Sequence, residues 1–154
     1  WLYRRKNEKI YKSEKYITSE GLRNSSAKLF PKGTTFIALV GATIGKTALS
    51  MFETSTNQNI AGMIPKSESQ LDRVYLFYAT QTLYHHFRRL GDGQFRMANL
   101  SFVRELKIPL PSIDVQKKIV SSLEEVEQVI EGNKNLITVY SQKIQDRISK
   151  VWGE

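Results

Sequence analysis

Hydrophobic and polar positions follow two different patterns along the chain, and the change falls near residue 112. Before it, short apolar runs rich in β-branched and aromatic residues are separated by turn residues, which predicts strands at 34–40, 46–52 and 58–65. Apolar residues between 69 and 90 recur at helical spacing and predict a helix. A glycine-rich loop follows, and ELKIPLP at 105–111 predicts a last short strand closed by two prolines.

From residue 112 onward the apolar positions repeat in heptads, as in a coiled-coil helix. Ser112 is placed to cap the start of this helix, and Asp114 lies in the first turn, where the helix dipole favours an anion. Asn133 occupies one core position, where a polar residue costs stability but can fix register. Seven residues, which we call the seam, fill the other core positions: Ile119, Leu123, Val126, Ile130, Ile137, Tyr140 and Ile144.

The length of this predicted helix implies a partner. About 39 residues at roughly 1.5 Å each give about 58 Å, more than the diameter of a small domain. Part of the seam must therefore pack on something beyond residues 1–111, such as a second helix in a dimer or in a sister repeat. An alternative is that Gly132-Asn133 breaks the segment into a hairpin of two helices.

Together these patterns predict an α+β chain with two parts. Residues 1–111, which we call the body, are expected to form a mixed, strongly twisted β-sheet with short helices, followed over 112–154 by one long C-terminal coiled-coil helix. The chain has no cysteine and no apolar run that could span a bilayer, so we expect a cytoplasmic protein without a membrane partner. Because the chain starts at Trp1 rather than Met, we expect it to be truncated at the N-terminus.

The charge is concentrated in the body. Residues 1–111 contain 17 Lys and Arg against 8 Asp and Glu, whereas residues 112–154 contain 6 against 7. A solvated basic face would explain the excess of positive charge, but its confinement to one part favours a polyanionic partner, most often nucleic acid.

The stretch VGATIGKTALS at 40–50 has the appearance of a phosphate-binding loop. A Walker A loop needs four residues between its first glycine and the Gly-Lys pair, and only three separate Gly41 from Gly45-Lys46. The loop must also open a helix, whereas the following residues are strand-like. We therefore predict a glycine turn between two strands, with Lys46 available to a phosphate of a nucleic acid backbone.

No catalytic or metal-binding arrangement is apparent in the sequence. His85 and His86 are adjacent on a predicted helix and point about 100° apart, and no carboxylate cluster or nucleophile motif accompanies them. Arg, Asn and Gln in glycine-containing loops are, in contrast, the side chains that read base edges or neutralise phosphates. The candidate DNA contacts are Lys32, Thr43, Lys46, Asn57, Gln58, Arg88, Arg89, Gln94, Arg96 and Asn99.

The ordered set of motifs SAKLFPKGTTFIALVGATIGKTAL, NQNIAGMIP, YLFYAT and GDGQFRMANLSFVRELKIPLPSIDVQKKIVSSLE resembles the target recognition domain of specificity subunits in type I restriction–modification systems. The resemblance extends from about Tyr16 to the end of the chain. It departs from the family at Val115-Gln116, where Glu-Gln is usual, and the family's usual opening strand is absent.

This resemblance implies a non-catalytic domain that recognises double-stranded DNA. Family members carry two such domains, each followed by a long helix, and the two helices pack antiparallel. The helices also dock methyltransferase subunits, which hold S-adenosylmethionine, so no cofactor is expected on this chain. The chain could be one half of such a subunit, a half-size subunit that forms a homodimer, or the end of a fused adenine methyltransferase or restriction enzyme. The alternative function is a protein-interaction module that acts through the coiled coil, with an incidental basic body.

Overall fold

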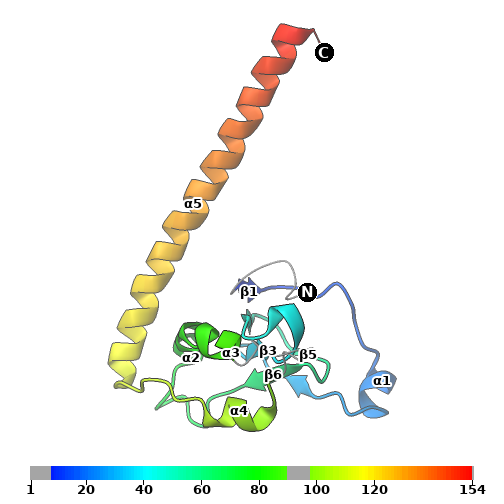
Figure 1. Cartoon of the computed structure of the whole chain (residues 1–154), viewed down its shortest axis with the longest axis vertical. Coiled ribbons are helices and arrows are strands. Elements are labelled where there is room, and N and C mark those ends of the chain that lie inside the picture. Colours follow the sequence, from blue (N-terminus) through cyan, green and yellow to red (C-terminus); the bar gives the residue numbers. More distant parts are fainter. Residues whose placement is uncertain (1–7, 90–97, 154) are drawn as a thin grey trace. The chain divides into compact units, whose positions relative to one another are not determined.

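The computed structural model describes residues 8–89 and 98–153, and it divides the chain into two compact units, 1–117 and 118–154. The first unit therefore contains the body and the first turn of the C-terminal helix. In chain order the elements are β1 Glu8–Ile10, α1 Ser19–Arg23, β2 Leu29–Phe30, β3 Thr35–Ala38, the 3₁₀ turn η1 Gly41–Thr43, β4 Thr47–Ser50, β5 Thr54–Ser55, β6 Ile60–Met63, α2 Arg73–Thr82, α3 Tyr84–Arg89, α4 Leu100–Glu105 and α5 Ile113–Trp152 (Figure 1).

A mixed four-stranded sheet in the order β1-β4-β3-β6 forms the centre of the body, confirming the predicted α+β class. β3 pairs antiparallel with both β4 and β6, and β1 joins the far edge of β4 in parallel. β2 and β5 form a separate antiparallel pair. The three predicted strands are confirmed as β3, β4 and β6, because β-branched and apolar side chains suit a pleated, half-buried surface.

The two faces of β3 are covered by different parts of the body. Ile37 packs with Phe87 of α3, and Phe102 of α4 joins the same cluster, its ring 5.0 Å from that of Phe87. On the other face, Phe30 of β2 lies edge-on to Phe36 at 5.3 Å. Phe30 also covers Gly62, where a Cβ atom would come within 2.5 Å of its ring. The two central strands, β3 and β4, are therefore fully buried, whereas the edge strands β1 and β6 are mostly half-buried.

The predicted helix between 69 and 90 is two helices, α2 and α3, which meet at Leu83. Asp72 caps α2, since its Oδ1 accepts hydrogen bonds from the backbone N–H groups of Val74 and Tyr75, each at 2.8 Å. Helix α4 was not predicted. It begins at Leu100, within the stretch that the sequence predicted as a glycine-rich loop, and the Oδ1 of Asn99 accepts a hydrogen bond from Phe102 N–H at 2.8 Å.

The predicted strand at 105–111 is wrong. Glu105 ends α4, and residues 106–112 are an extended connection without a strand partner among the described residues. Pro109 and Pro111 have no backbone N–H to offer a sheet. Side chains bind their carbonyls instead: the hydroxyl of Tyr75 donates to Pro109 at 3.0 Å, and the amide of Gln116 donates to Pro111 at 2.8 Å.

Helix α5 is continuous from Ile113 to Trp152, so the alternative of a break at Gly132-Asn133 is wrong. A single glycine in a long helix costs only about 1 kcal/mol relative to alanine, which the surrounding helix formers offset. The backbone N–H of Gln116 donates to the Ser112 carbonyl at 3.0 Å, and Asp114 lies in the first turn, as predicted. Among the helices that the structure describes, none is both long and apolar enough to cross a membrane.

Candidate nucleic-acid interface

The turn at 41–46 joins β3 to β4 as the tip of a hairpin, and this arrangement excludes a phosphate-binding loop of the Walker type. The N–H of Gly45 donates to the Ala38 carbonyl at 2.9 Å, and the N–H of Ala38 donates to the Lys46 carbonyl at 3.0 Å. Gly41 and Gly45 have φ values of 69° and 77°, in the left-handed region that favours glycine. A strand follows the turn where a nucleotide site would need a helix.

Two candidate DNA contacts, Thr43 and Lys46, lie in this turn and differ in how far their side chains are exposed to solvent. Thr43 is buried, and its hydroxyl donates to the Val40 carbonyl at 3.3 Å, so this side chain shapes the turn. Lys46 is half-buried. Two hydrogen bonds fix its backbone: its N–H donates to the Thr43 carbonyl at 2.9 Å, and its carbonyl accepts from the N–H of Ala38 at 3.0 Å. Lys46 therefore offers an ammonium group from a rigid support.

The loop between β5 and β6 presents consecutive polar side chains to solvent. Asn57, Gln58 and Asn59 are all exposed. The Oδ1 of Asn57 accepts a hydrogen bond from the N–H of Asn59 at 3.0 Å, and the N–H of Ile60 donates to the Asn57 carbonyl at 3.3 Å. These bonds hold the loop in a fixed turn, which reduces the entropy that it would lose on binding a ligand.

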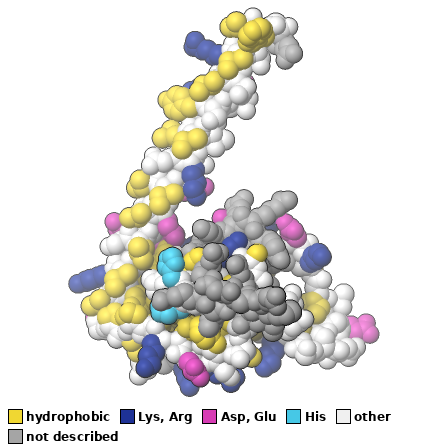
Figure 2. Space-filling view, viewed as in Figure 1, with side chains coloured by type: hydrophobic (Ala, Val, Ile, Leu, Met, Phe, Trp, Pro, Cys, Tyr) yellow, Lys and Arg dark blue, Asp and Glu magenta, His cyan; other side chains and the backbone are white. Residues whose placement is uncertain are grey.

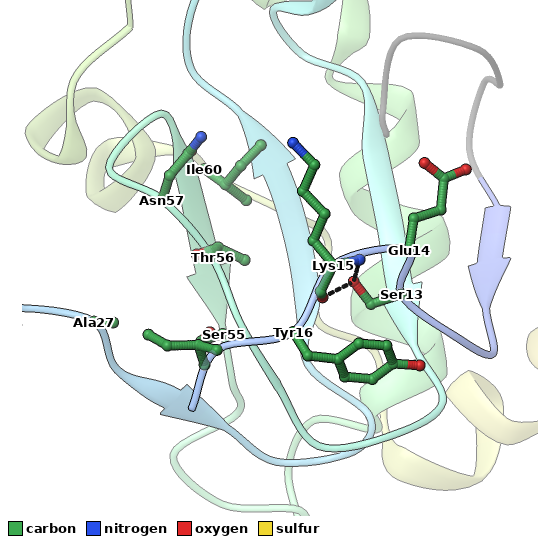
Figure 3. A pocket seen from close by; sticks show the side chains of 10 residues that line it. Ser13, Glu14, Lys15, Tyr16, Ala27, Ser55, Thr56, Asn57 and Ile60 are labelled. Atoms are coloured by element: carbon green, nitrogen blue, oxygen red, sulfur yellow. Dashed lines mark hydrogen bonds between the residues drawn. The ribbon is translucent and has the colours of Figure 1, made fainter. Parts of the chain in front are cut away.

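An open pocket of about 570 Å³ lies beside this loop. One wall is the segment Ser13–Ile17, between β1 and α1, and the other includes Ser55, Thr56 and Asn57 (Figure 3). Ala27 and Ile60 complete the lining. Sequence reasoning pointed to Asn57 but missed Lys15 and Tyr16, because nothing in their spacing indicates that 13–17 and 55–60 lie side by side.

The remaining candidate contacts are spread over other elements. Lys32 is exposed on the turn after β2, and its carbonyl accepts a hydrogen bond from Arg73 Nη1 at 2.9 Å. Asn99 is exposed but serves as the cap of α4. Arg88 and Arg89 lie in α3, and Gln94 and Arg96 lie outside the described residues.

Helix α5 carries a stripe of apolar side chains that no described residue of its own unit covers. All seven seam residues are exposed, from 37% for Leu123 to 67% for Ile137. Val129 and Leu136 flank the seam on one side and are 64% and 55% exposed. Figure 2 shows the hydrophobic side chains as a stripe along most of the helix. An apolar face that includes a flanking position is wider than the seam of a two-stranded coiled coil.

The described residues contain no group of three or more His, Cys, Asp or Glu side chains that could hold a metal ion. His85 and His86 are both exposed on α3, and the ring of His85 lies 5.9 Å from that of Tyr84. The described residues therefore offer two surfaces for binding: the basic body with its polar loops, and the exposed apolar stripe of α5.

Comparison with protein families gives one match that spans most of the chain. The family described as the type I restriction modification DNA specificity domain matches residues 3–139. Among curated proteins, the type I restriction enzyme MjaIX specificity subunit of Methanocaldococcus jannaschii is 29% identical over 144 residues, covering 93% of this chain and 33% of the relative. The putative MjaX specificity subunit of the same organism is 27% identical over 93 residues, covering 60% of this chain and 22% of the relative.

Two solved structures share the fold. A chain from a study of complex assembly and conformational transition of the type I R-M system has a TM-score of 0.60 at 23% identity, over 70% of this chain and 26% of that one. The HsdS subunit from Thermoanaerobacter tengcongensis has a TM-score of 0.57 at 22% identity, over 70% and 25%. The chain thus spans a third or less of the length of these relatives.

Proposed function

The chain belongs to the type I restriction modification DNA specificity domain family, and from that premise we propose that its body recognises a specific double-stranded DNA sequence. This recognition would direct an adenine methyltransferase, and restriction machinery associated with it, to the target. Domains of this family recognise DNA and are not catalytic. The family match over residues 3–139 is the observation that carries the proposal.

The distribution of charge supports DNA as the ligand of the body. The body holds 17 Lys and Arg against 8 Asp and Glu, so it carries a clear excess of positive charge. Phosphate contacts supply affinity that is independent of sequence, and polar side chains supply the discrimination between bases. Lys32 and Lys46 are suited to the first role, and Asn57 and Gln58 to the second.

The apolar stripe of α5 supports a protein partner for the helix. At about 1.5 Å per residue its 40 residues span about 60 Å, and every seam position is exposed. We propose that the seam packs against an equivalent helix, either from a second recognition domain or from a second copy of this chain. The flanking Val129 and Leu136 would then meet a methyltransferase subunit or domain, and S-adenosylmethionine would be held there rather than by this chain.

The salt dependence of duplex binding tests the DNA part of the proposal. Phosphate contacts release counterions, so the logarithm of the affinity should fall linearly with the logarithm of the salt concentration. Fluorescence anisotropy with a labelled duplex at several salt concentrations would give the slope. A flat response would contradict binding by the basic body.

A second candidate function is that of a protein-interaction module whose working part is α5. The open stripe on this helix favours it. Analytical ultracentrifugation with and without duplex DNA separates the two. Association through the helix without any DNA-bound species would favour the interaction module, whereas a DNA-bound species would favour the recognition domain.

A further inference from the structure

The pocket between residues 13–17 and the β5–β6 loop exposes an aromatic side chain that the sequence motifs did not single out. Tyr16 is 85% exposed, the largest value among the exposed large hydrophobic residues of the described chain. Tyrosine is favoured at interfaces because it combines an apolar ring with a polar hydroxyl, and its two χ angles cost little entropy. Such a side chain on a basic body is placed to contact a ligand rather than the protein core.

A local turn fixes the segment that carries this tyrosine. The hydroxyl of Ser13 donates to the Lys15 carbonyl at 2.7 Å and accepts from the N–H of Lys15 at 3.3 Å. Figure 3 shows both bonds and the Lys15 side chain extending toward the side where Asn57 projects, with Ile60 between them. Ser13 and Ile60 are half-buried, whereas Glu14, Lys15, Tyr16 and Asn57 are exposed. The exposed residues therefore form a rim around a less polar interior.

The hydrogen bond between Asn57 and Asn59 determines which end of the Asn57 amide faces a ligand. A backbone N–H can only donate, so the atom that it meets must be the Oδ1 of Asn57, 3.0 Å away. The Nδ2 group, which has two hydrogens, then forms the outer end of the side chain, as drawn in Figure 3. Asn57 thus offers hydrogen-bond donors to a ligand.

We infer that the rim of this pocket reads base edges in the major groove, with Asn57 as a donor to guanine and Tyr16 as an apolar contact. The inference rests on the proposed function and names the residues that perform it. The pocket admits no duplex, so the DNA lies across its opening and the rim side chains reach into the groove. Guanine presents two acceptors there, O6 and N7, which matches the two hydrogens of the Nδ2 group, whereas bidentate pairing with adenine would need the one remaining lone pair of the Oδ1, which already accepts from Asn59.

The other rim residues complete this arrangement. Lys15 is suited to a phosphate, and the carboxylate of Glu14 repels phosphates but accepts a hydrogen bond from the amino group of cytosine. A phosphate bound by Lys15 would then lie on the same side of the pocket as Asn57 (Figure 3). The ring of Tyr16 is suited to the methyl group of thymine.

Selection from a pool of duplexes with randomised sequence tests the inference, with the purified protein as wild type and as Asn57→Asp. Aspartate keeps the oxygen that Asn59 N–H binds but removes the donor. We expect the selected consensus to lose a guanine at one position, and the affinity for the wild-type consensus to fall roughly 10-fold. Asn24→Asp is the matched control, because Asn24 is exposed, lies outside the pocket and undergoes the same change in charge.

Tyr16→Ser provides a second test from the opposite wall of the pocket and should relax the preference at a different position. If Asn57→Asp and Tyr16→Ser select the wild-type consensus as strictly as Asn24→Asp does, the inference is overturned while the proposed function stands. A uniform loss of affinity over all duplexes, equal to that of the control, also overturns it. If the wild type selects no consensus at all, the proposed function itself fails.

Discussion

The side-chain amide of Gln116 donates a hydrogen bond to the backbone carbonyl of Gln70 at 2.8 Å, across 46 positions of sequence. Gln116 is fully buried, and it also donates to the Pro111 carbonyl and accepts from the N–H of Asp72 at 2.9 Å. One side chain therefore satisfies three backbone groups where the chain leaves the body, enters α5 and approaches the start of α2.

Replacement of Gln116 should destabilise the first unit strongly. Leucine has a similar size but would leave these backbone groups unpaired, and each buried unsatisfied group costs about 1–3 kcal/mol. We expect Gln116→Leu to lower the free energy of unfolding by about 3 kcal/mol or more in urea titrations. Gln128→Leu, at an exposed position of the same helix, should change it by less than about 0.5 kcal/mol. Equal effects of the two changes would contradict this role for Gln116.

Two glycines should respond in opposite directions to alanine. Gly45 has φ 77°, and a Cβ atom there would come within 2.6 Å of the Phe87 Cβ, so Gly45→Ala should cost at least about 2 kcal/mol. Gly132 lies in α5 with nothing within 4 Å of a Cβ atom, so Gly132→Ala should stabilise the helix by about 0.5–1 kcal/mol. Thermal melts followed by circular dichroism measure both changes. A stabilising Gly45→Ala would show that the hairpin turn does not pack against α3 as described.

Loss of the ammonium group at Lys46 should weaken duplex binding without changing sequence preference. If Lys46 meets a phosphate, Lys46→Ala lowers affinity for all duplexes about equally and reduces the salt slope by about one. Lys134→Ala is the control, since it removes the same charge from an exposed site on α5. An altered base preference in Lys46→Ala would instead assign this residue to base reading.

A charge in the seam should abolish helix pairing while the body stays folded. Ile130 is 48% exposed at a seam position, and an aspartate there would bury an unpaired carboxylate in any helix–helix contact. We expect Ile130→Asp to sediment as a smaller species than the wild type, with an unchanged unfolding transition of the body. Gln145→Asp introduces the same charge at an exposed position outside the seam and should leave association intact. Survival of the assembly in Ile130→Asp would contradict the seam assignment.

The strands and the long helix could be predicted from local sequence, because residue type in the strands and heptad spacing in the helix match where these side chains lie. The runs that became β3 and β4 are continuous, rich in β-branched and apolar residues and separated by a glycine turn, which suits two buried neighbouring strands, and the heptads of α5 continue through Gly132. The error at 105–111 has a physical cause as well. Apolar residues in ELKIPLP pack against the core, as Leu106 and Ile108 do, but the prolines prevent pairing in a sheet.

The candidate site is less visible in the sequence, because it depends on contacts between distant segments. Asn57 and Gln58 could be found from side-chain type. Tyr16 becomes a candidate contact only in the structure, because there residues 13–17 and the β5–β6 loop line the same pocket. A tyrosine next to a lysine, outside any apolar period, is the local signal that the sequence offered. Thr43 was a candidate by position in the turn, and its burial could not be read from sequence.

The ratio of affinities for two duplexes measures whether the body reads the sequence of DNA. One duplex carries the sequence selected by the wild-type protein, and the other has the same length and composition in scrambled order, both at one physiological salt concentration. Specific recognition predicts a ratio on the order of 10³ or more in favour of the selected duplex. A ratio near one, with the salt dependence retained, would show that the basic body binds DNA without reading it and would contradict the account.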